Sequence, residues 1–191
     1  MRDAKNLRRG EEMDVGQHYL EDALNEFRRL KKSADKAMAQ VSDAEFFRKL
    51  GAEENSIALI VKHIAGNLHS RWEKFLTTDG EKPERKRDSE FEIDPDDARA
   101  SLIERWEHGW AILFRELEPL KSEDLLRTVL IRSEPYTVVR AINRQLTHYG
   151  EHVGQIVFLA KHLAGAKWQT LSIPRGKSEE FNAKWAAKLK T

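Results

Sequence analysis

Histidine is the residue type in this sequence that could do chemistry. Seven histidines occur in 191 residues, and His148 and His152 stand four apart in a segment with helical periodicity. Residues i and i+4 lie on one face of an α-helix, about one turn apart. Two neutral imidazoles so placed can bind one divalent metal ion. Such a pair also arises by chance, so the spacing leaves two interpretations open: a metal site, or structural and solvent-facing histidines.

A mononuclear site needs a third ligand, and an earlier amphipathic segment offers two candidates. His63 and His69 each lie about 120° from the centre of its apolar stripe, on opposite flanks. Asn67 follows His63 by one turn, and Glu73 follows His69 by one turn. The periodicity therefore leaves both histidines open. The remaining three are expected at the surface or its boundary: His18, His108 and His162.

The string from His148 to His152 also matches H-x-x-E-H, the inverted motif of some zinc peptidases. Such an enzyme needs a further carboxylate ligand well downstream, and only residues 153–191 follow. Glu151 points about 60° away from His148 on the helical wheel, outward from the core. We therefore interpret Glu151 as a solvated helix carboxylate. The glycine-rich phosphate-binding motifs and the serine-hydrolase elbow are absent from the sequence.

Composition excludes several classes of protein. Lys and Arg number 33 against 32 Asp and Glu, a net charge of +1 that argues against a dedicated partner among nucleic acids or anionic membranes. The basic clusters at residues 28–32 and 82–87 have acids nearby and no aromatic platform, so we expect solvated faces. Cysteine is absent, which removes thiolate ligands and nucleophiles and fits a cytoplasmic location. No apolar run approaches the roughly 18 residues that span a membrane.

Apolar residues recurring at intervals of three, four and seven predict long amphipathic helices. Charged residues make up 34% of the chain while glycine and proline are few, which also favours helices over sheets. The sequence therefore predicts an all-α fold, a four-helix bundle with a short C-terminal tail helix. The four helices are expected over residues 14–40, 56–76, 95–117 and 136–163.

The connections carry their own signals. Asp94-Pro95 predicts the start of the third helix, with the aspartate as N-cap and proline at the first helical position. Residues 81–90 contain no apolar residue except proline and are expected to form a solvated loop. Residues 120–135 are expected to be an extended connection, with a β-like alternation from Thr128 to Ile131.

Three parts of the chain are predicted. Residues 1–13 form a flexible extension, residues 14–165 the bundle, and residues 166–191 a tail that packs on the bundle or on a partner. Phe181, Trp185 and Leu189 share one side of the tail helix. Together with the resemblance given below, this apolar surface predicts a homodimer.

Two segments carry a resemblance to a known family. In the predicted second helix it rests on Val61, His63, Asn67, His69, Arg71 and Trp72. In the predicted fourth helix it rests on Leu146, His148, Glu151, His152, Gly154, Gln155 and Ile156. Over about residues 14–165 the chain resembles the DinB/YfiT-like superfamily. Residues 78–83 and 170–176 resemble one subfamily of it that has no assigned function.

The resemblance implies a metal site within a four-helix bundle. One histidine of the second helix and an H-x-x-x-H pair of the fourth hold the ion in this superfamily, which implies His63, His148 and His152 as ligands, and not His69. Imidazole ligands without a carboxylate cluster favour zinc or nickel, with iron and manganese as alternatives. The superfamily includes enzymes that use low-molecular-weight thiols.

Two functions follow as expectations. The first is a metal-dependent transferase or hydrolase that acts on small thiol-linked or electrophilic molecules. Since the chain has no cysteine, any thiol would be an added cosubstrate. The alternative is a non-catalytic metal-binding bundle with a structural or stress-response role. No catalytic residue is assigned, and Asn67, Tyr149 and Glu151 are left without a role.

Overall fold

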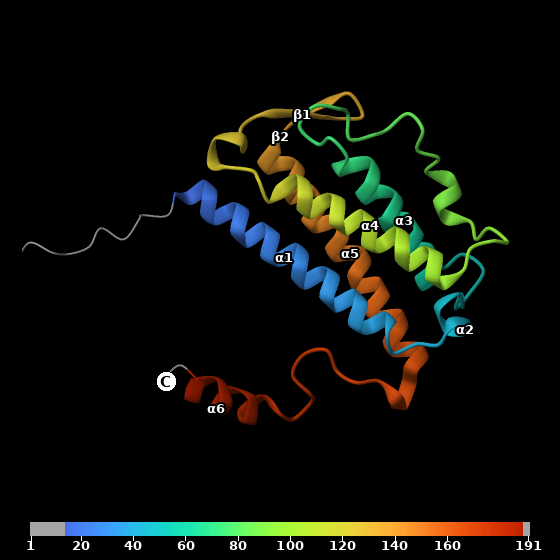
Figure 1. Cartoon of the computed structure of the whole chain (residues 1–191). Helices are drawn as coiled ribbons and strands as arrows, with labels where there is room; N and C mark the ends of the chain where they lie inside the picture. The colour runs from blue at the N-terminus through green and yellow to red at the C-terminus, as the bar shows by residue number, and fades with distance from the viewer. Residues whose placement is uncertain (1–13, 189–191) are drawn as a thin grey trace, which may run out of the picture.

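Four long helices dominate the computed structural model, which describes residues 14–188 (Figure 1). α3 packs along α4, α1 packs along α5, and α3 also contacts α5. The broad expectation of an all-α fold is confirmed, with one small sheet added. The predicted extension, residues 1–13, lies outside the described residues. The four helices are α1 Val15–Met38, α3 Ile57–Trp72, α4 Arg99–Leu117 and α5 Val138–Ala164.

Short elements connect the long helices. An antiparallel hairpin of β1 (Thr128–Ile131) and β2 (Glu134–Thr137) precedes α5 and realises the predicted alternation. Its turn places Arg132 and Ser133 at positive φ, 57° and 63°. The remaining short elements are α2 Asp43–Phe46, η1 Asp88–Phe91, η2 Ser122–Asp124, η3 Gly165–Lys167 and α6 Ser178–Lys188.

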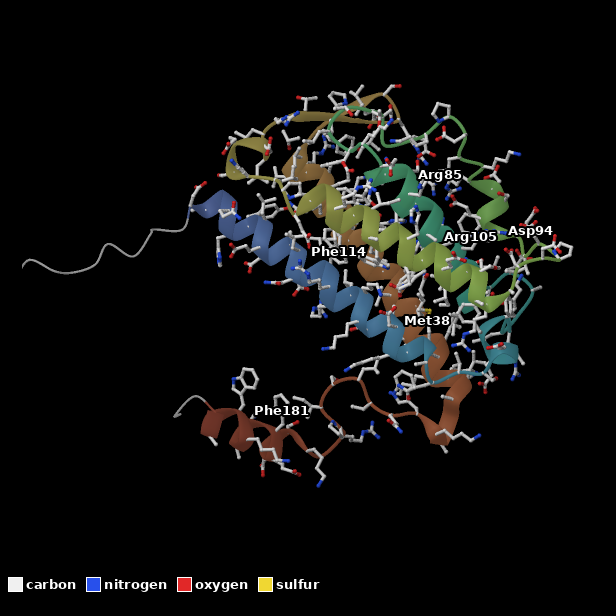
Figure 2. The ribbon with its side chains drawn as sticks, in the orientation of Figure 1. Met38, Arg85, Asp94, Arg105, Phe114 and Phe181 are labelled. Carbon is white, nitrogen blue, oxygen red and sulfur yellow. The ribbon has the colours of Figure 1, made fainter. Side chains whose placement is uncertain are left out.

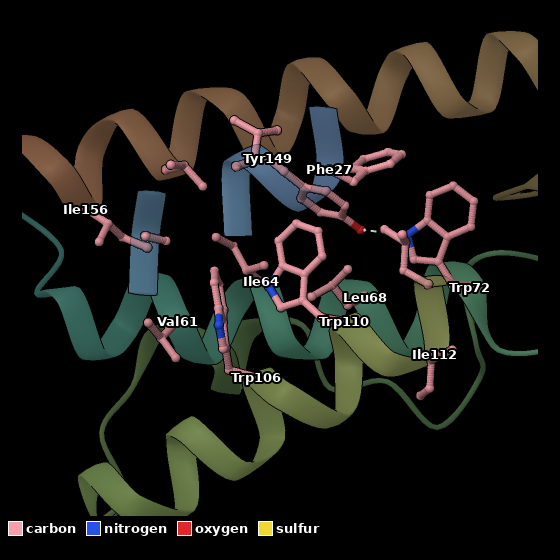
Figure 3. Packing of buried hydrophobic residues seen from close by; sticks show 14 of the residues in the cluster. Phe27, Val61, Ile64, Leu68, Trp72, Trp106, Trp110, Ile112, Tyr149 and Ile156 are labelled. Atoms are coloured by element: carbon pink, nitrogen blue, oxygen red, sulfur yellow. Dashed lines mark hydrogen bonds between the residues drawn. The ribbon is translucent and has the colours of Figure 1, made fainter. Parts of the chain in front are cut away.

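An aromatic cluster joins all four long helices in the core (Figure 3). Phe27 of α1, Trp72 of α3, Trp110 of α4 and Tyr149 of α5 are fully buried. The Phe27 ring lies 6.0–6.3 Å from each of the other three, in edge-on or tilted contacts. Aromatic pairs at this separation add to the free energy of area burial. The cluster therefore fixes how each helix is rotated toward the core.

Hydrogen bonds in the same region set the register of α5 on α3. The indole Nε1 of Trp72 donates to the Tyr149 hydroxyl at 3.1 Å, as Figure 3 shows, and that hydroxyl donates to Asn67 Oδ1 at 2.9 Å. All three groups are buried, so each needs its partner. Since His148 precedes Tyr149, this register also decides where His148 meets α3.

The third long helix begins later than predicted. It starts at Arg99, not at Asp94-Pro95. The Asp94 carboxylate accepts a hydrogen bond from Lys62 Nζ at 2.7 Å, and Asp97 accepts from the same ammonium at 2.7 Å. Lys62 is only 7% exposed, so its charge needs these carboxylates. The ion pairs hold residues 94–97 outside the helix, and the capping signal at Asp94 is overridden.

The start of the C-terminal tail packs against the core. Trp168 and Leu171 pack against the core, and the Gln169 backbone N–H donates to Gln40 Oε1 at 2.6 Å. α6 then stands apart from the long helices (Figures 1 and 2). Its Phe181 and Trp185 are 45% and 58% exposed. Leu189 lies outside the described residues. None of the described helices is both long and apolar enough for a membrane span.

Candidate metal centre

Three histidines from two helices meet at one point of the structure. His63 of α3 and His148 and His152 of α5 each offer one ring nitrogen, and these nitrogens lie within 4.8 Å of one another. The shortest distance is 3.4 Å, between Nε2 of His63 and Nε2 of His148. Two nitrogens that bind a tetrahedral zinc ion at about 2.0–2.1 Å are themselves about 3.3 Å apart. The described geometry therefore suits one shared divalent ion.

The other histidines lie elsewhere. His69, the second candidate on α3, is exposed and stacks against His108 with 6.3 Å between ring centroids. His18 and His162 are also exposed. Of the two candidates that the helical wheel left open, the structure brings only His63 to the pair on α5. This agrees with the assignment implied by the resemblance.

A buried carboxylate orients His63. Glu90 Oε2 lies 2.9 Å from His63 Nδ1, which leaves Nε2 of the same ring facing His148. Arg85 in turn donates two hydrogen bonds to the Glu90 carboxylate, at 2.7 and 2.8 Å. A carboxylate behind a ligating imidazole fixes its tautomer and raises its basicity. Arg85, Glu90 and His63 thus form a chain that supports the triad.

The prediction that residues 81–90 form a solvated loop was wrong at Arg85 and Glu90. Glu90 is 7% exposed and the Arg85 side chain 5%, although the segment has the composition of a solvated loop. The loop folds back over α3, and Gly66 makes room for it. A Cβ atom at Gly66 would lie 2.3 Å from Glu90 Oε1. The residue types alone contain no signal that marks Glu90, except that it directly precedes the apolar Phe91, whose ring lies 4.8 Å from that of His63.

The two histidines of α5 differ in their hydrogen-bond partners. His152 Nδ1 lies 2.9 Å from Gln155 Oε1, one turn along the helix, so its Nε2 is left for a ligand. His148 Nδ1 is buried without a hydrogen-bond partner among the described residues. A buried polar nitrogen without a partner is costly. The nitrogen of His148 that faces the shared point is Nε2, 3.4 Å from Nε2 of His63.

The comparisons with known proteins point to one family. A family model described as a protein of unknown function, DUF1572, matches residues 14–177. The chain belongs to the DUF1572 family. All three histidines, Glu90 and Gln155 lie within the matched range. A comparison with curated proteins found no match.

Burial favours the neutral form of the two α5 histidines in this DUF1572 chain. The pKa of His148 falls from 6.5 to about 3, mainly because of burial, and the neighbouring His152 and His63 contribute in the same direction. Burial likewise lowers the pKa of His152. Burial alone would raise the pKa of Glu90, but hydrogen bonds from His63 and Arg85 outweigh it and hold that pKa below its usual value. Neutral imidazoles are the form that binds metal.

The sequence assigned no role to Asn67, Tyr149 or Glu151, and the structure shows where each of them lies. Asn67 and Tyr149 are buried and bonded to each other, and burial raises the pKa of the Tyr149 hydroxyl far above its ordinary value. Neither is placed to move a proton for a substrate. Glu151 is exposed, as the helical wheel predicts. The geometry therefore leaves the three imidazoles as the chemically competent groups of the site.

A cavity of about 400 Å³ lies beside the Arg85–Glu90 pair that supports the triad. It runs along the neighbouring face of α3 and reaches α4 and residues 82–90. Glu90 and Arg85 belong to its wall, whereas the three histidines do not. In Figure 2, Arg85 and Arg105 mark this side of the molecule. The cavity and the triad are therefore separate spaces that share the Arg85–Glu90 pair.

Proposed function

We propose that this DUF1572 protein binds one divalent metal ion through His63, His148 and His152 and uses it in a transfer or hydrolysis reaction on a small thiol-linked or electrophilic molecule. The convergence of three imidazoles from α3 and α5 supports this proposal. Imidazole donors favour zinc or nickel over magnesium or calcium. The resemblance of α3 and α5 to the DinB/YfiT-like superfamily points in the same direction.

The number of protein ligands is the observation that favours an enzyme. Among residues 14–188, no fourth histidine or carboxylate joins the group of three. Structural zinc sites are closed by four protein ligands, whereas catalytic sites keep one position for water or substrate. A bound ion with such a position lowers the pKa of a water or thiol toward about 7.

The protein's own residues would then prepare the site. Glu90 and Gln155 hold His63 and His152 with one nitrogen turned toward the shared point. Arg85 keeps Glu90 ionised. The buried core behind Tyr149 excludes water from the inner side, so a substrate would approach from the half-exposed side of α5.

Metal analysis of protein purified without a histidine tag tests the proposal. We expect about one divalent ion per chain, and its loss in His148→Ala and in His152→Ala. His69→Ala is the matched control, because His69 is on the same helix as His63 but exposed, and it should keep the ion. Equal metal content in all four proteins would overturn the assignment of the ligands.

Cobalt substitution separates the enzyme from the structural alternative. Tetrahedral Co²⁺ absorbs strongly in the visible region, and azide or a small thiol that enters an open position changes that spectrum. A change on titration supports an exchangeable position. A spectrum that no added ligand alters would instead favour a non-catalytic metal-binding bundle.

A homodimer remains our proposal for the assembly. Phe181 and Trp185 of α6 stack on each other, 6.2 Å apart, on a helix that stands away from the long helices. Exposed apolar side chains of this kind are typical of a surface that a partner chain covers. Light scattering at micromolar concentration should give twice the 22.2 kDa chain mass, and the 22.2 kDa mass alone would contradict the dimer.

A further inference from the structure

Arginine and carboxylate side chains lie close together beside the triad. Arg71, Arg85 and Arg132 all share Glu81, whose carboxylate lies 3.7, 3.4 and 3.3 Å from them. Asp79 is close by, but it accepts hydrogen bonds from backbone N–H groups, including that of Arg132 at 2.8 Å. Glu90 is occupied by Arg85 and His63. The three guanidinium groups are therefore matched in number only when all three carboxylates are counted, and any further guanidinium carries an unbalanced positive charge.

Arg144 adds a further cation without a carboxylate partner. It is exposed on α5, and no described carboxylate lies within 4.0 Å of its guanidinium. When the Gln145 amide is oriented so that its oxygen faces the donors, that oxygen accepts from Arg144 Nη1 at 3.0 Å and from Arg71 Nε at 3.1 Å. Two guanidinium groups thus share one neutral acceptor. The acceptor that they share carries no negative charge.

The position of Arg144 relates it to the triad. It precedes His148 by four residues, so it lies on the same face of α5, about 6 Å along the helix axis. Glu151 stands between the two ligands in the sequence, about 60° from His148 on the helical wheel, and it is exposed. Arg144, His148 and His152 therefore share one row of α5, and Glu151 lies off that row.

We propose that Arg144 binds a carboxylate of the substrate, so that the site selects small thiols or electrophiles bearing an anionic group about one helical turn from the metal. This inference rests on the function proposed above. A guanidinium offers two parallel N–H donors to a carboxylate, a pairing stronger than a neutral hydrogen bond. The substrate's anionic end points toward Arg144 and away from Glu151.

Arg140 provides a matched control on the same helix. It lies one further turn from the triad, is also exposed, and rests its guanidinium on the Tyr136 ring at 4.2 Å. Arg140→Gln removes the same charge from the same row of α5 without altering the surroundings of His148. Arg144→Lys keeps the charge but loses the paired donors.

The test uses Co²⁺-loaded full-length protein and three thiols of similar size. They are 3-mercaptopropionate, which carries a carboxylate, 2-mercaptoethanol, which is neutral, and cysteamine, which is cationic. Dissociation constants come from the thiolate-to-cobalt absorption. For wild type and Arg140→Gln we expect 3-mercaptopropionate to bind about ten-fold more tightly than 2-mercaptoethanol, as one charge-assisted hydrogen bond would give. The preference should weaken with added salt.

The variants decide the assignment. Arg144→Gln should bind all three thiols within about two-fold of one another, with unchanged cobalt affinity, and Arg144→Lys should keep part of the preference. Equal binding of the three thiols by wild type would overturn this inference and leave the proposed function standing. A preference that persists in Arg144→Gln would also overturn it. If no thiol changes the cobalt spectrum, the proposed function fails, and the inference fails with it.

Discussion

Glu90 lies 2.9 Å from Nδ1 of His63, the nitrogen that faces away from the other two histidines. The contact joins two segments separated by 27 residues, and both side chains are buried. It turns Nε2 of His63 toward His148, and Arg85 keeps the carboxylate in place from behind. The orientation of the triad therefore depends on a residue that would not bind the metal itself.

Replacing Glu90 should weaken metal binding without removing it. Glu90→Gln keeps the size of the side chain but loses the charge that supports the His63 imidazole and the partner of Arg85. Changes behind a ligating histidine typically cost 10- to 100-fold in metal affinity. Competition with a chelator of known affinity measures the change. Glu84→Gln, an exposed residue of the same loop, should leave the affinity unchanged. Equal affinities for the two variants would contradict the role of Glu90.

A methyl group at position 66 should act through the same carboxylate. In Gly66→Ala the new Cβ would meet Glu90 Oε1 at 2.3 Å, and Glu90 cannot simply rotate away, because Arg85 and His63 hold both of its oxygens. We expect lower metal affinity with a nearly unchanged circular dichroism spectrum. Gly154→Ala on α5 has no atom within 4 Å and is the control. It should keep the affinity and gain up to about 1 kcal/mol in stability from helix propensity. An unchanged metal affinity in Gly66→Ala would show that the loop carrying Glu90 moves to accommodate the methyl group, and would contradict this prediction.

Acid should destabilise the metal-free fold through His148. Its pKa is 6.5 when unperturbed and falls to about 3 in the folded protein, first because of burial. Between these values the unfolded chain binds a proton that the folded chain does not, so the free energy of unfolding decreases as pH falls from about 6.5 toward 3. Thermal melts of metal-free protein at pH 7 and pH 5 measure this slope.

The variant His148→Gln removes the titrating group and should flatten that slope. His18→Gln, at an exposed position, should retain the wild-type slope. If melting temperatures of the metal-free wild type are the same at both pH values, the neutral state of His148 would not contribute to folding.

Removing the Tyr149 hydroxyl should destabilise the core while the ring packing remains. Tyr149→Phe leaves Trp72 Nε1 without its acceptor and removes one of the donors to Asn67, all in a buried region. An unsatisfied buried polar group costs about 1–3 kcal/mol, which lowers the melting temperature of a chain this size by about 2–12 °C. Tyr136→Phe, whose hydroxyl is in an exposed contact, is the control and should change it little. If Tyr149→Phe also lost metal affinity, the loss would indicate that α5 has shifted relative to α3.

The sequence alone predicted the parts of the molecule that depend on local periodicity. Helical spacing of apolar residues identified the four long helices, and the i, i+4 spacing placed His148 and His152 on one face of α5. The boundary at Asp94 was wrong because a distant buried lysine, Lys62, recruits the carboxylate that would have capped the helix. Local signals cannot include such a competitor.

Helical periodicity left open which histidine of α3 meets the pair, and the tertiary structure brings His63 there. His63 and His69 are equivalent on the helical wheel, on opposite flanks of the stripe. The choice follows from the rotation and register of α5 on α3, which the contacts of Tyr149 with Phe27, Trp72 and Asn67 set. The same packing brings the charged loop over Gly66 and buries Glu90 against His63. A charged residue in a polar loop is solvated by default, so only the three-dimensional contact with an imidazole and a guanidinium reveals that it supports the site.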